Sequence, residues 1–140
     1  MYLVQLCYAS DASDALEPEE VNNIHATAQE NNSKLGVTGA LFFHNGHFLQ
    51  CLEGSRASVN EVYYRILNDK RHKNIALLTF QDIHERQFNR WDMGLIDDKN
   101  LIEVLSIKYS GTKAFSPHHM SGLAANRLMV QLSETTLPFS

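Results

Sequence analysis

Cysteine is scarce in this chain of 140 residues, which contains only Cys7 and Cys51. Two cysteines do not make the framework of paired bridges that stabilises small secreted domains. The first five residues also lack the basic segment of a secretory signal peptide. We therefore expect a cytoplasmic protein in which both thiols stay reduced.

Long apolar runs and an excess of positive charge are missing as well. No run approaches the roughly 20 apolar residues of a membrane-spanning helix, so we expect no membrane partner. Lys and Arg number 12 against 16 Asp and Glu, which gives a net charge of −4. This balance argues against nucleic acid or an anionic membrane surface as the main partner. No glycine-rich loop opens a helix, so the usual phosphate cradle is also absent from the sequence.

The dipeptide Asn45-Gly46 separates two apolar runs that are rich in aromatic residues, Thr38 to His44 and His47 to Glu53. Asn-Gly tolerates positive φ at both positions and therefore favours a two-residue type I′ turn. The stretch from Gly36 to Gly54 is predicted to be a β-hairpin, around which the rest of the chain is organised.

Hydrophobic periodicity and turn residues predict the elements on either side of this hairpin. In chain order they are a strand at 2–8, a helix from Pro18 to about 31–33, a helix that begins after Ser55 or Ser58 and ends at 69–73, a strand at 75–80 and a short strand at 93–96. The resulting order βαββαββ is typical of an α+β ferredoxin-like sandwich with one added strand. Because the strand at 75–80 is strongly apolar, we expect both of its faces to be buried.

The tail is expected to add two C-terminal helices. The apolar stripe of the first is Leu101, Val104, Leu105 and Tyr109, with Gly111 at its end; the second opens at Ser116-Pro117 and carries Met120, Leu123, Ala124, Leu128 and Leu132. Both faces of the hairpin are apolar, and the first two helices can cover only one of them. We therefore expect Leu101, Leu105, Leu123 and Leu128 to be buried against the face that carries Leu49 and Cys51, with a partner chain as the alternative cover.

Gln50 is a lone amide on an apolar strand face, between Phe48 and Leu52. From this stretch alone, a hydrogen bond to a neighbouring backbone or hydroxyl group is its more common role. In a ferredoxin-like sheet the first and third strands are antiparallel neighbours. If Tyr8 lies opposite Gln50, its hydroxyl is within reach of the amide, and the two cysteines face each other on the opposite side of the sheet.

Tyr8, Asn32, Gln50, Trp91 and Met93, set in this order of elements, resemble the BLUF domain, a family of blue-light sensors that use a flavin, usually FAD. Supporting stretches are 36–41, 48–54, 69–72, 84–88 and 91–94; Gln87-Phe88 departs from the Arg-Phe that is frequent in the family. The resemblance implies a flavin-binding domain at 1–97, followed by a helical extension at 98–140 that packs on the sheet. It also implies a sensor rather than an enzyme, with FAD as cofactor and FMN or riboflavin possible.

The resemblance further assigns residues to the flavin, whose ring would lie between the first two helices. Ile24 and Ile66 would contact the ring faces, Asn32 the pyrimidine edge with Arg65 and Asp69 beside it, and Asn31, Arg71 and His72 would lie toward the ribityl and phosphate part. Each polar residue has an ordinary alternative: a helix end for Asn32, a surface ion pair for Arg65 and Asp69, and a solvated helix end for Arg71 and His72.

The photochemistry that the resemblance implies centres on two residues. Gln50 would bridge Tyr8 and the flavin, and Tyr8 would give an electron and a proton to the photoexcited flavin. A phenol with an ordinary pKa of about 10 is neutral at cell pH. Recombination would leave the Gln50 amide rotated or tautomerised and the flavin absorption reversibly shifted to the red. Trp91 and Met93, on one side of the last strand, would pass this change to the surface, although core packing is the ordinary role of a tryptophan.

Other functions are compatible with the same sandwich fold. An RNA-binding module would need a basic, open sheet face, and a small-ligand-binding module of this fold is the other alternative. An acyl-phosphate hydrolase would need the missing phosphate cradle. Metal binding at His44 and His47, or at His118-His119, lacks a convincing ligand set. Because no output domain follows in the sequence, we expect a bacterial light sensor that acts through an unidentified downstream protein or as a homo-oligomer.

Overall fold

The computed structural model describes residues 2–14, 16–88, 94–96 and 99–135. The elements are β1 (Leu3–Ala12), α1 (Pro18–Leu35), β2 (Thr38–His44), β3 (His47–Ser55), α2 (Arg56–Leu67), β4 (His72–Ile83), β5 (Gly94–Ile96), α3 (Lys99–Ser110), the short 3-10 helix η1 (Pro117–His119) and α4 (Gly122–Thr135).

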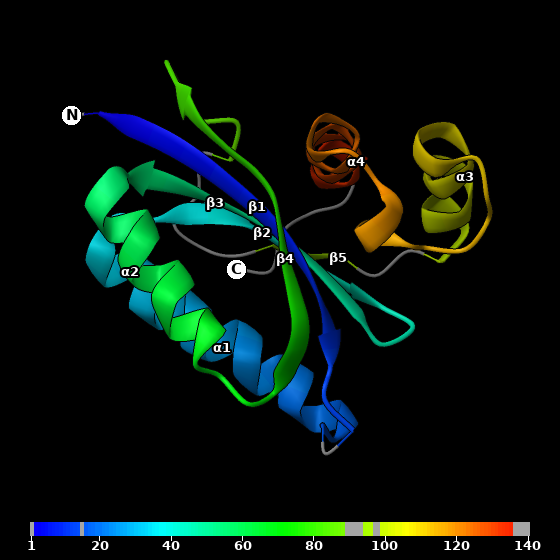
Figure 1. Ribbon diagram of the computed structural model, residues 1–140, viewed down its shortest axis with the longest axis horizontal. Coiled ribbons are helices and arrows are strands. Elements are labelled where there is room, and N and C mark those ends of the chain that lie inside the picture. The colour runs from blue at the N-terminus through cyan, green and yellow to red at the C-terminus, as the bar shows by residue number, and fades with distance from the viewer. Residues whose placement is uncertain (1, 15, 89–93, 97–98, 136–140) are drawn as a thin grey trace.

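One five-stranded sheet in the order β4-β1-β3-β2-β5 forms the middle layer of the protein. Neighbouring strands are antiparallel, except that β5 runs parallel to β2. Helices α1 and α2 cover one face of the sheet, and α3 and α4 lie on the other side (Figure 1). The predicted ferredoxin-like α+β sandwich with two added helices is therefore confirmed, and the sheet separates two apolar cores.

The local signals around the hairpin are confirmed by the backbone geometry. Asn45 and Gly46 have φ values of 50° and 79°, as a type I′ turn requires. Gly36 caps α1 in the left-handed conformation, so this helix continues to Leu35, slightly beyond its expected end. Ser55, rather than Ser58, caps α2, because its hydroxyl accepts a hydrogen bond from the Ser58 backbone N–H at 3.2 Å.

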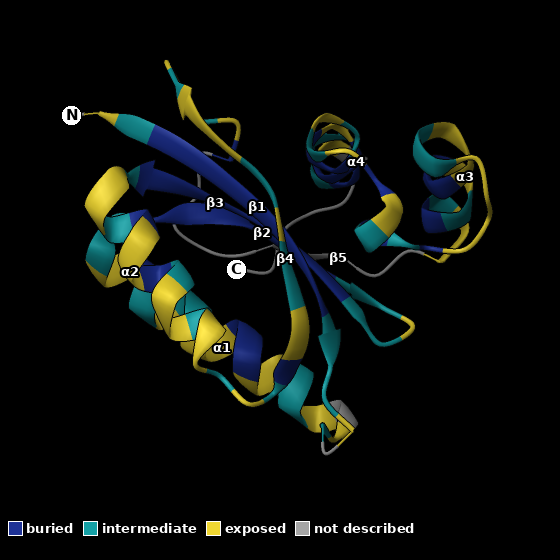
Figure 2. Cartoon of the chain, in the orientation of Figure 1, coloured by how far each residue is buried: buried dark blue, intermediate teal, exposed yellow. Residues whose placement is uncertain are grey.

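The prediction that the fourth strand is buried on both faces is wrong. Strand β4 lies at the edge of the sheet and is more exposed than the strands inside it (Figure 2). Leu77 and Phe80 keep 51% and 40% of their surface exposed. An apolar composition therefore does not distinguish an edge strand from a central one. The strand is also longer than expected, because it pairs with β1 from His72 to Ile83.

The tail covers the second sheet face, but two of its predicted core residues are exposed. Leu105 and Leu128 are buried in the same cluster as Leu49 and Cys51, and Leu101 packs against it; Val104 and Leu123, at 63% and 64% exposure, point to solvent. Ser116-Pro117 opens the short η1 rather than a long helix, and α4 begins only at Gly122. A side chain at Gly122 would collide with the Leu78 carbonyl oxygen and lie 2.7 Å from Thr79 Cβ, so glycine allows α4 to start directly on β4.

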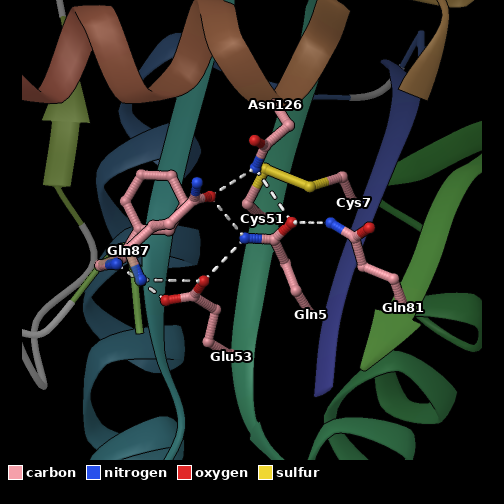
Figure 3. Close-up of a disulfide and its surroundings, with 8 residues drawn as sticks. Gln5, Cys7, Cys51, Glu53, Gln81, Gln87 and Asn126 are labelled. Atoms are coloured by element: carbon pink, nitrogen blue, oxygen red, sulfur yellow. Dashed lines mark hydrogen bonds between the residues drawn. A yellow bond between two sulfur atoms is a disulfide. The ribbon is translucent and has the colours of Figure 1, made fainter. Parts of the chain in front are cut away.

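The expectation of two reduced thiols is contradicted by the structure. Cys7 and Cys51 face each other in the β1–β3 ladder and form a disulfide beneath α4 (Figure 3). Both residues are fully buried. The ladder predicted their proximity correctly, but the number of cysteines in a sequence does not report the oxidation state of a pair that the fold places side by side.

Candidate functional site

A cavity of about 280 Å³ lies between α1, α2 and the sheet. Every residue predicted to contact a cofactor lines it: Ile24, Asn31, Asn32, Gln50, Arg65, Ile66, Asp69, Arg71 and His72. Tyr8 lines it as well, together with Thr27, Ala28 and Val62, which were not predicted as site residues. Helical spacing could have found these three, since Thr27 and Ala28 follow Ile24 by three and four positions and Val62 precedes Ile66 by four.

The floor of the cavity carries the predicted pair of polar residues. Tyr8 and Gln50 lie opposite each other in the β1–β3 ladder, and the Tyr8 hydroxyl donates a hydrogen bond to Gln50 Oε1. Both residues are almost completely buried. Burial, reinforced by the nearby Tyr63 and Asp69, raises the pKa of Tyr8 well above its usual value. The phenol is therefore neutral and holds its proton on the side of the amide.

Asn32 supplies the most direct sign that the cavity receives a polar ligand. The residue is fully buried at the end of α1, yet its side-chain Nδ2 and Oδ1 atoms have no hydrogen-bond partner among the described residues. A buried polar group without a partner costs roughly 1–3 kcal/mol. Because Asn32 lines the cavity, a ligand edge that carries an acceptor beside a donor would satisfy both atoms. The pyrimidine edge of a flavin has this pattern.

One end of the cavity is strongly polar. Asp69 and Arg71 form an ion pair with 2.7 Å between Oδ2 and Nη2, and a second contact of 2.9 Å joins Arg71 Nε to Oδ1. Burial alone would raise the pKa of Asp69, but the hydrogen bonds from Arg71 outweigh it and lower the pKa. Both charges are therefore kept at neutral pH. Arg65 pairs with Glu61 at 2.8 Å, so the alternative of a surface pair between Arg65 and Asp69 is not observed.

His72 lies between this polar end and the phenol. Its Nδ1 atom is 2.9 Å from Ser10 Oγ, and its ring packs against Phe48 with 4.6 Å between the ring centroids. Burial lowers the pKa of His72, so the imidazole is neutral at physiological pH. A solvated helix end, the ordinary alternative for this residue, does not describe a side chain that is buried in the wall of a cavity.

Two predicted relay residues, Trp91 and Met93, lie outside the described residues. Strand β5 begins directly after them at Gly94 and pairs with β2, where Leu95 is opposite Leu41. Leu41 is in turn opposite Gln50 in the β2–β3 ladder. The role of Trp91 and Met93 remains a prediction.

Two of the histidines that invited a metal hypothesis, His47 and His118, contact a carboxylate instead. His47 Nδ1 and His118 Nε2 lie 2.7 Å and 3.2 Å from the same carboxylate oxygen of Asp11, which ties η1 to the end of the sheet. Within residues 2–14, 16–88, 94–96 and 99–135, no group of three His, Cys, Asp or Glu side chains is arranged to hold a metal ion.

Comparison with known proteins gives a consistent result. The family model described as sensors of blue-light using FAD matches residues 3–94. The blue light- and temperature-regulated antirepressor of Escherichia coli K12 is 34% identical over 95 residues, which are 68% of this chain and 24% of that protein. The beta subunit of a photoactivated adenylate cyclase from Euglena longa is 33% identical over 61% of this chain and 10% of its own length. The match thus spans a quarter or less of these relatives.

Solved structures resemble a larger part of the chain. BlsA in its photo-activated state has a TM-score of 0.87 and 28% identity, with 99% of both chains covered. BlrB, a BLUF protein in its dark state, has a TM-score of 0.69 and 31% identity over 76% of this chain and 80% of its own. The similarity to BlsA therefore includes the region of the tail helices as well as the sheet.

Proposed function

We propose that this chain, which belongs to the BLUF family of blue-light sensors using FAD, detects light by moving an electron and a proton away from Tyr8 across Gln50. The observation that carries the proposal is the hydrogen bond from the Tyr8 hydroxyl to Gln50 Oε1 at the wall of the cavity. Because the chain belongs to this family, we favour a light sensor over the RNA-binding and small-ligand-binding functions that the fold alone left open. The chain acts as a sensor and not as an enzyme.

The residues present fit a flavin. Asn32 offers a free donor and a free acceptor for the pyrimidine edge, and Ile24 and Ile66 give the cavity apolar walls from α1 and α2. Arg65 and Asp69 would stand beside the same edge. Asn31, Arg71 and His72 would receive the ribityl and phosphate part, where a positive guanidinium favours a phosphate. This set is most consistent with FAD, and FMN or riboflavin would use fewer of these contacts.

When bound, the flavin supplies a light-activated oxidant for Tyr8. The protein controls the proton. The buried phenol is neutral before illumination, and its hydroxyl hydrogen already points at Gln50 Oε1. A Tyr8 that has lost an electron is a strong acid, so its proton passes to the amide oxygen. Once the electron and proton return, Gln50 can settle with its Nε2 toward Tyr8, because a hydroxyl accepts as readily as it donates.

The experiment that tests this function is optical. The purified chain, loaded with FAD, should be yellow, and blue light should shift its absorption to the red, with recovery in the dark. The red shift is expected because the new Gln50 orientation changes the hydrogen bonds around the ring. A protein that binds FAD but whose spectrum is unchanged by blue light would refute the proposal.

The output of the sensor is a second part of the proposal. We assign residues 1–97 to the flavin-binding domain and 98–140 to the helical extension, and we infer that the extension or β5 presents the light state to an unidentified downstream protein or to a second copy of the chain. No helix in the described part of the chain is long and apolar enough to cross a membrane. A cytoplasmic location remains a prediction that the Cys7–Cys51 disulfide does not support, since such bonds are rare there.

A change of assembly or of partner binding is measurable directly. If light changes the assembly of the chain, light scattering of the purified, flavin-loaded protein should give a different molar mass in the dark and under blue light. If light instead changes partner binding, the complex that the protein forms in extract from the source cell should differ in mass between the two states. Identical masses in both states, with the extract present, would contradict the proposed output.

A further inference from the structure

A cluster of amides and one carboxyl group, buried at its centre but exposed at Gln81 and Gln87, lies between the sheet and α4, on the face opposite the cavity (Figure 3). It joins β1, β3, β4, the segment after β4 and α4 through Gln5, Glu53, Gln81, Gln87 and Asn126. Gln5 and Glu53 have no exposed surface and Asn126 has 4%. Polar groups this deeply buried beneath a helix are costly unless every hydrogen bond is made.

Gln5 stands at the centre of the cluster and uses both ends of its amide twice. Its Nε2 donates to Glu53 Oε2 at 2.7 Å and to Gln87 Oε1 at 2.8 Å. Its Oε1 accepts from Gln81 Nε2 and from Asn126 Nδ2, each at 3.0 Å. This is the full capacity of a primary amide. A reversed Gln5 amide would therefore disturb every neighbour in the cluster.

The carboxyl group of Glu53 sets the direction of these bonds. It accepts from Gln5 Nε2 and from the backbone N–H groups of Gln87 and Phe88, at 3.2 Å and 2.7 Å. Because all three neighbours are donors, the arrangement fits a carboxylate. A carboxylate only accepts, so Gln5 must turn Nε2 toward it and Oε1 away from it. Asn126 must then donate to Gln5 and also to Gln87 Oε1, at 2.9 Å.

The cluster is tied to the photochemical pair by the same two strands. Gln5 precedes Tyr8 by three residues on β1, and Glu53 follows Gln50 by three residues on β3. Both pairs are in register in one ladder, Gln5 opposite Glu53 and Tyr8 opposite Gln50, and they point to opposite faces of the sheet. A displacement of β3 relative to β1 that follows a change at Gln50 therefore reaches the Gln5–Glu53 bond within one ladder.

We propose that Gln5, Glu53, Gln87 and Asn126 form a polar latch that transmits the light state from Gln50 to α4, with the Glu53 carboxylate fixing the direction of its hydrogen bonds. This inference rests on the proposed function. Light loosens the latch when β3 carries Glu53 away from Gln5, because Gln5 then no longer holds its oxygen toward Asn126. Helix α4 is the part of the tail that responds to the change, because its residue Asn126 is hydrogen-bonded to Gln5 and Gln87.

Hydrogen exchange of the backbone amides of α4 tests the latch in the full-length, FAD-loaded protein. The wild-type protein should exchange faster in this helix under blue light than in the dark. Asn126→Asp keeps the shape but places an oxygen against Gln5 Oε1 and Gln87 Oε1, so exchange should be fast in the dark and the light–dark difference should be lost. The red shift should stay normal, because Tyr8 and Gln50 lie on the other face.

Ser106→Ala is the control, since this buried α3 hydroxyl has no hydrogen-bond partner among the described residues. It should leave both the exchange of α4 and the red shift unchanged.

A charge relocation separates a directional latch from simple packing. Glu53→Gln alone should also abolish the light–dark difference. The double variant Glu53→Gln with Asn126→Asp moves the carboxylate from position 53 to position 126, at the opposite end of the amide cluster. The side-chain amides of Gln5, Gln81 and Gln87 can then all reverse, and only the Gln87 backbone N–H loses its acceptor. The double variant should regain the light–dark difference in α4.

The outcomes are distinct. Light-dependent exchange of α4 in Asn126→Asp, or no recovery in the double variant, would overturn the latch. Should Asn126→Asp alone fail to fold, the double variant decides, and its failure to fold would also overturn the proposal. A wild-type protein with a normal red shift but the same α4 exchange in light and dark would overturn the latch and leave the proposed function intact. Bound FAD without a red shift would instead refute the proposed function.

Discussion

Tyr8→Phe should leave the protein yellow and abolish its reversible red shift. The substitution removes one hydroxyl from a fully buried ring, so the walls of the cavity and the contacts of the β1–β3 ladder remain. What is lost is the donor of the electron and the proton, together with the hydrogen bond from the Tyr8 hydroxyl to Gln50 Oε1. A phenylalanine ring has neither an acidic proton nor an accessible oxidation, so the amide has no reason to rearrange after excitation.

Gln50→Leu should give the same spectroscopic loss by a different route. It leaves the donor in place and removes the link that can switch. The Tyr8 hydroxyl then loses its amide partner, at a cost of about 1–3 kcal/mol, which a domain with about 5–15 kcal/mol of stability tolerates. Flavin binding should survive, because Asn32, Ile24 and Ile66 still line the cavity.

The measurement is the difference spectrum before and after blue light, recorded on FAD-loaded protein. Tyr63→Phe is a matched control: its ring centroid is 5.7 Å from that of Tyr8, but it is not the tyrosine opposite Gln50. This control should retain the red shift. A normal red shift in Tyr8→Phe or Gln50→Leu would refute the role of that residue without affecting family membership.

Much of the site could be predicted because it depends on short-range periodicity. The alternation of a strand places Tyr8 and Gln50 on one face, and the expected topology places their strands side by side. Helical spacing directs Ile24 and Ile66 inward from two helices that cover the same face. These two periods converge on one cavity. The polar contacts Asn31, Asn32, Arg65, Asp69, Arg71 and His72 were predicted from the resemblance to the BLUF family and not from periodicity, and they line the same cavity.

The remaining features depend on contacts between distant parts of the chain. Leu77 and Phe80 look like core residues until the order of the strands puts β4 at the edge. Gln5 and Asn126 are 121 positions apart, and each resembles an ordinary surface residue in the sequence. The amide network could not be predicted, because a polar residue on an otherwise apolar face indicates that partners are needed but not which ones.

The tail provides the other large expected effect. Removing all residues after Ile96 should make the protein aggregate, because Phe42, Leu49 and the disulfide are completely buried in the cluster that the tail completes. The tail contributes several fully buried apolar side chains: Ile102, Leu128, Met129 and Leu132. Burying each one is worth about 1.5–3 kcal/mol, so their sum is comparable to the whole stability of a typical domain. Size-exclusion chromatography should find the truncated protein in aggregates, and a soluble, monomeric and photoactive truncation would contradict this.

Two leucines in the same helix allow a finer test in the full-length chain. Leu128 is 1% exposed and Leu123 is 64% exposed, although the sequence predicted both to be buried. Leu128→Ala should lower the free energy of unfolding by about 2–5 kcal/mol, because it removes apolar contacts and leaves a cavity beneath α4. Leu123→Ala should change it by no more than about 0.5 kcal/mol. Urea denaturation of the two variants measures the difference. Equal effects would mean that α4 does not present the Leu128 face to the sheet, and the aggregation of the truncated chain would then need another cause.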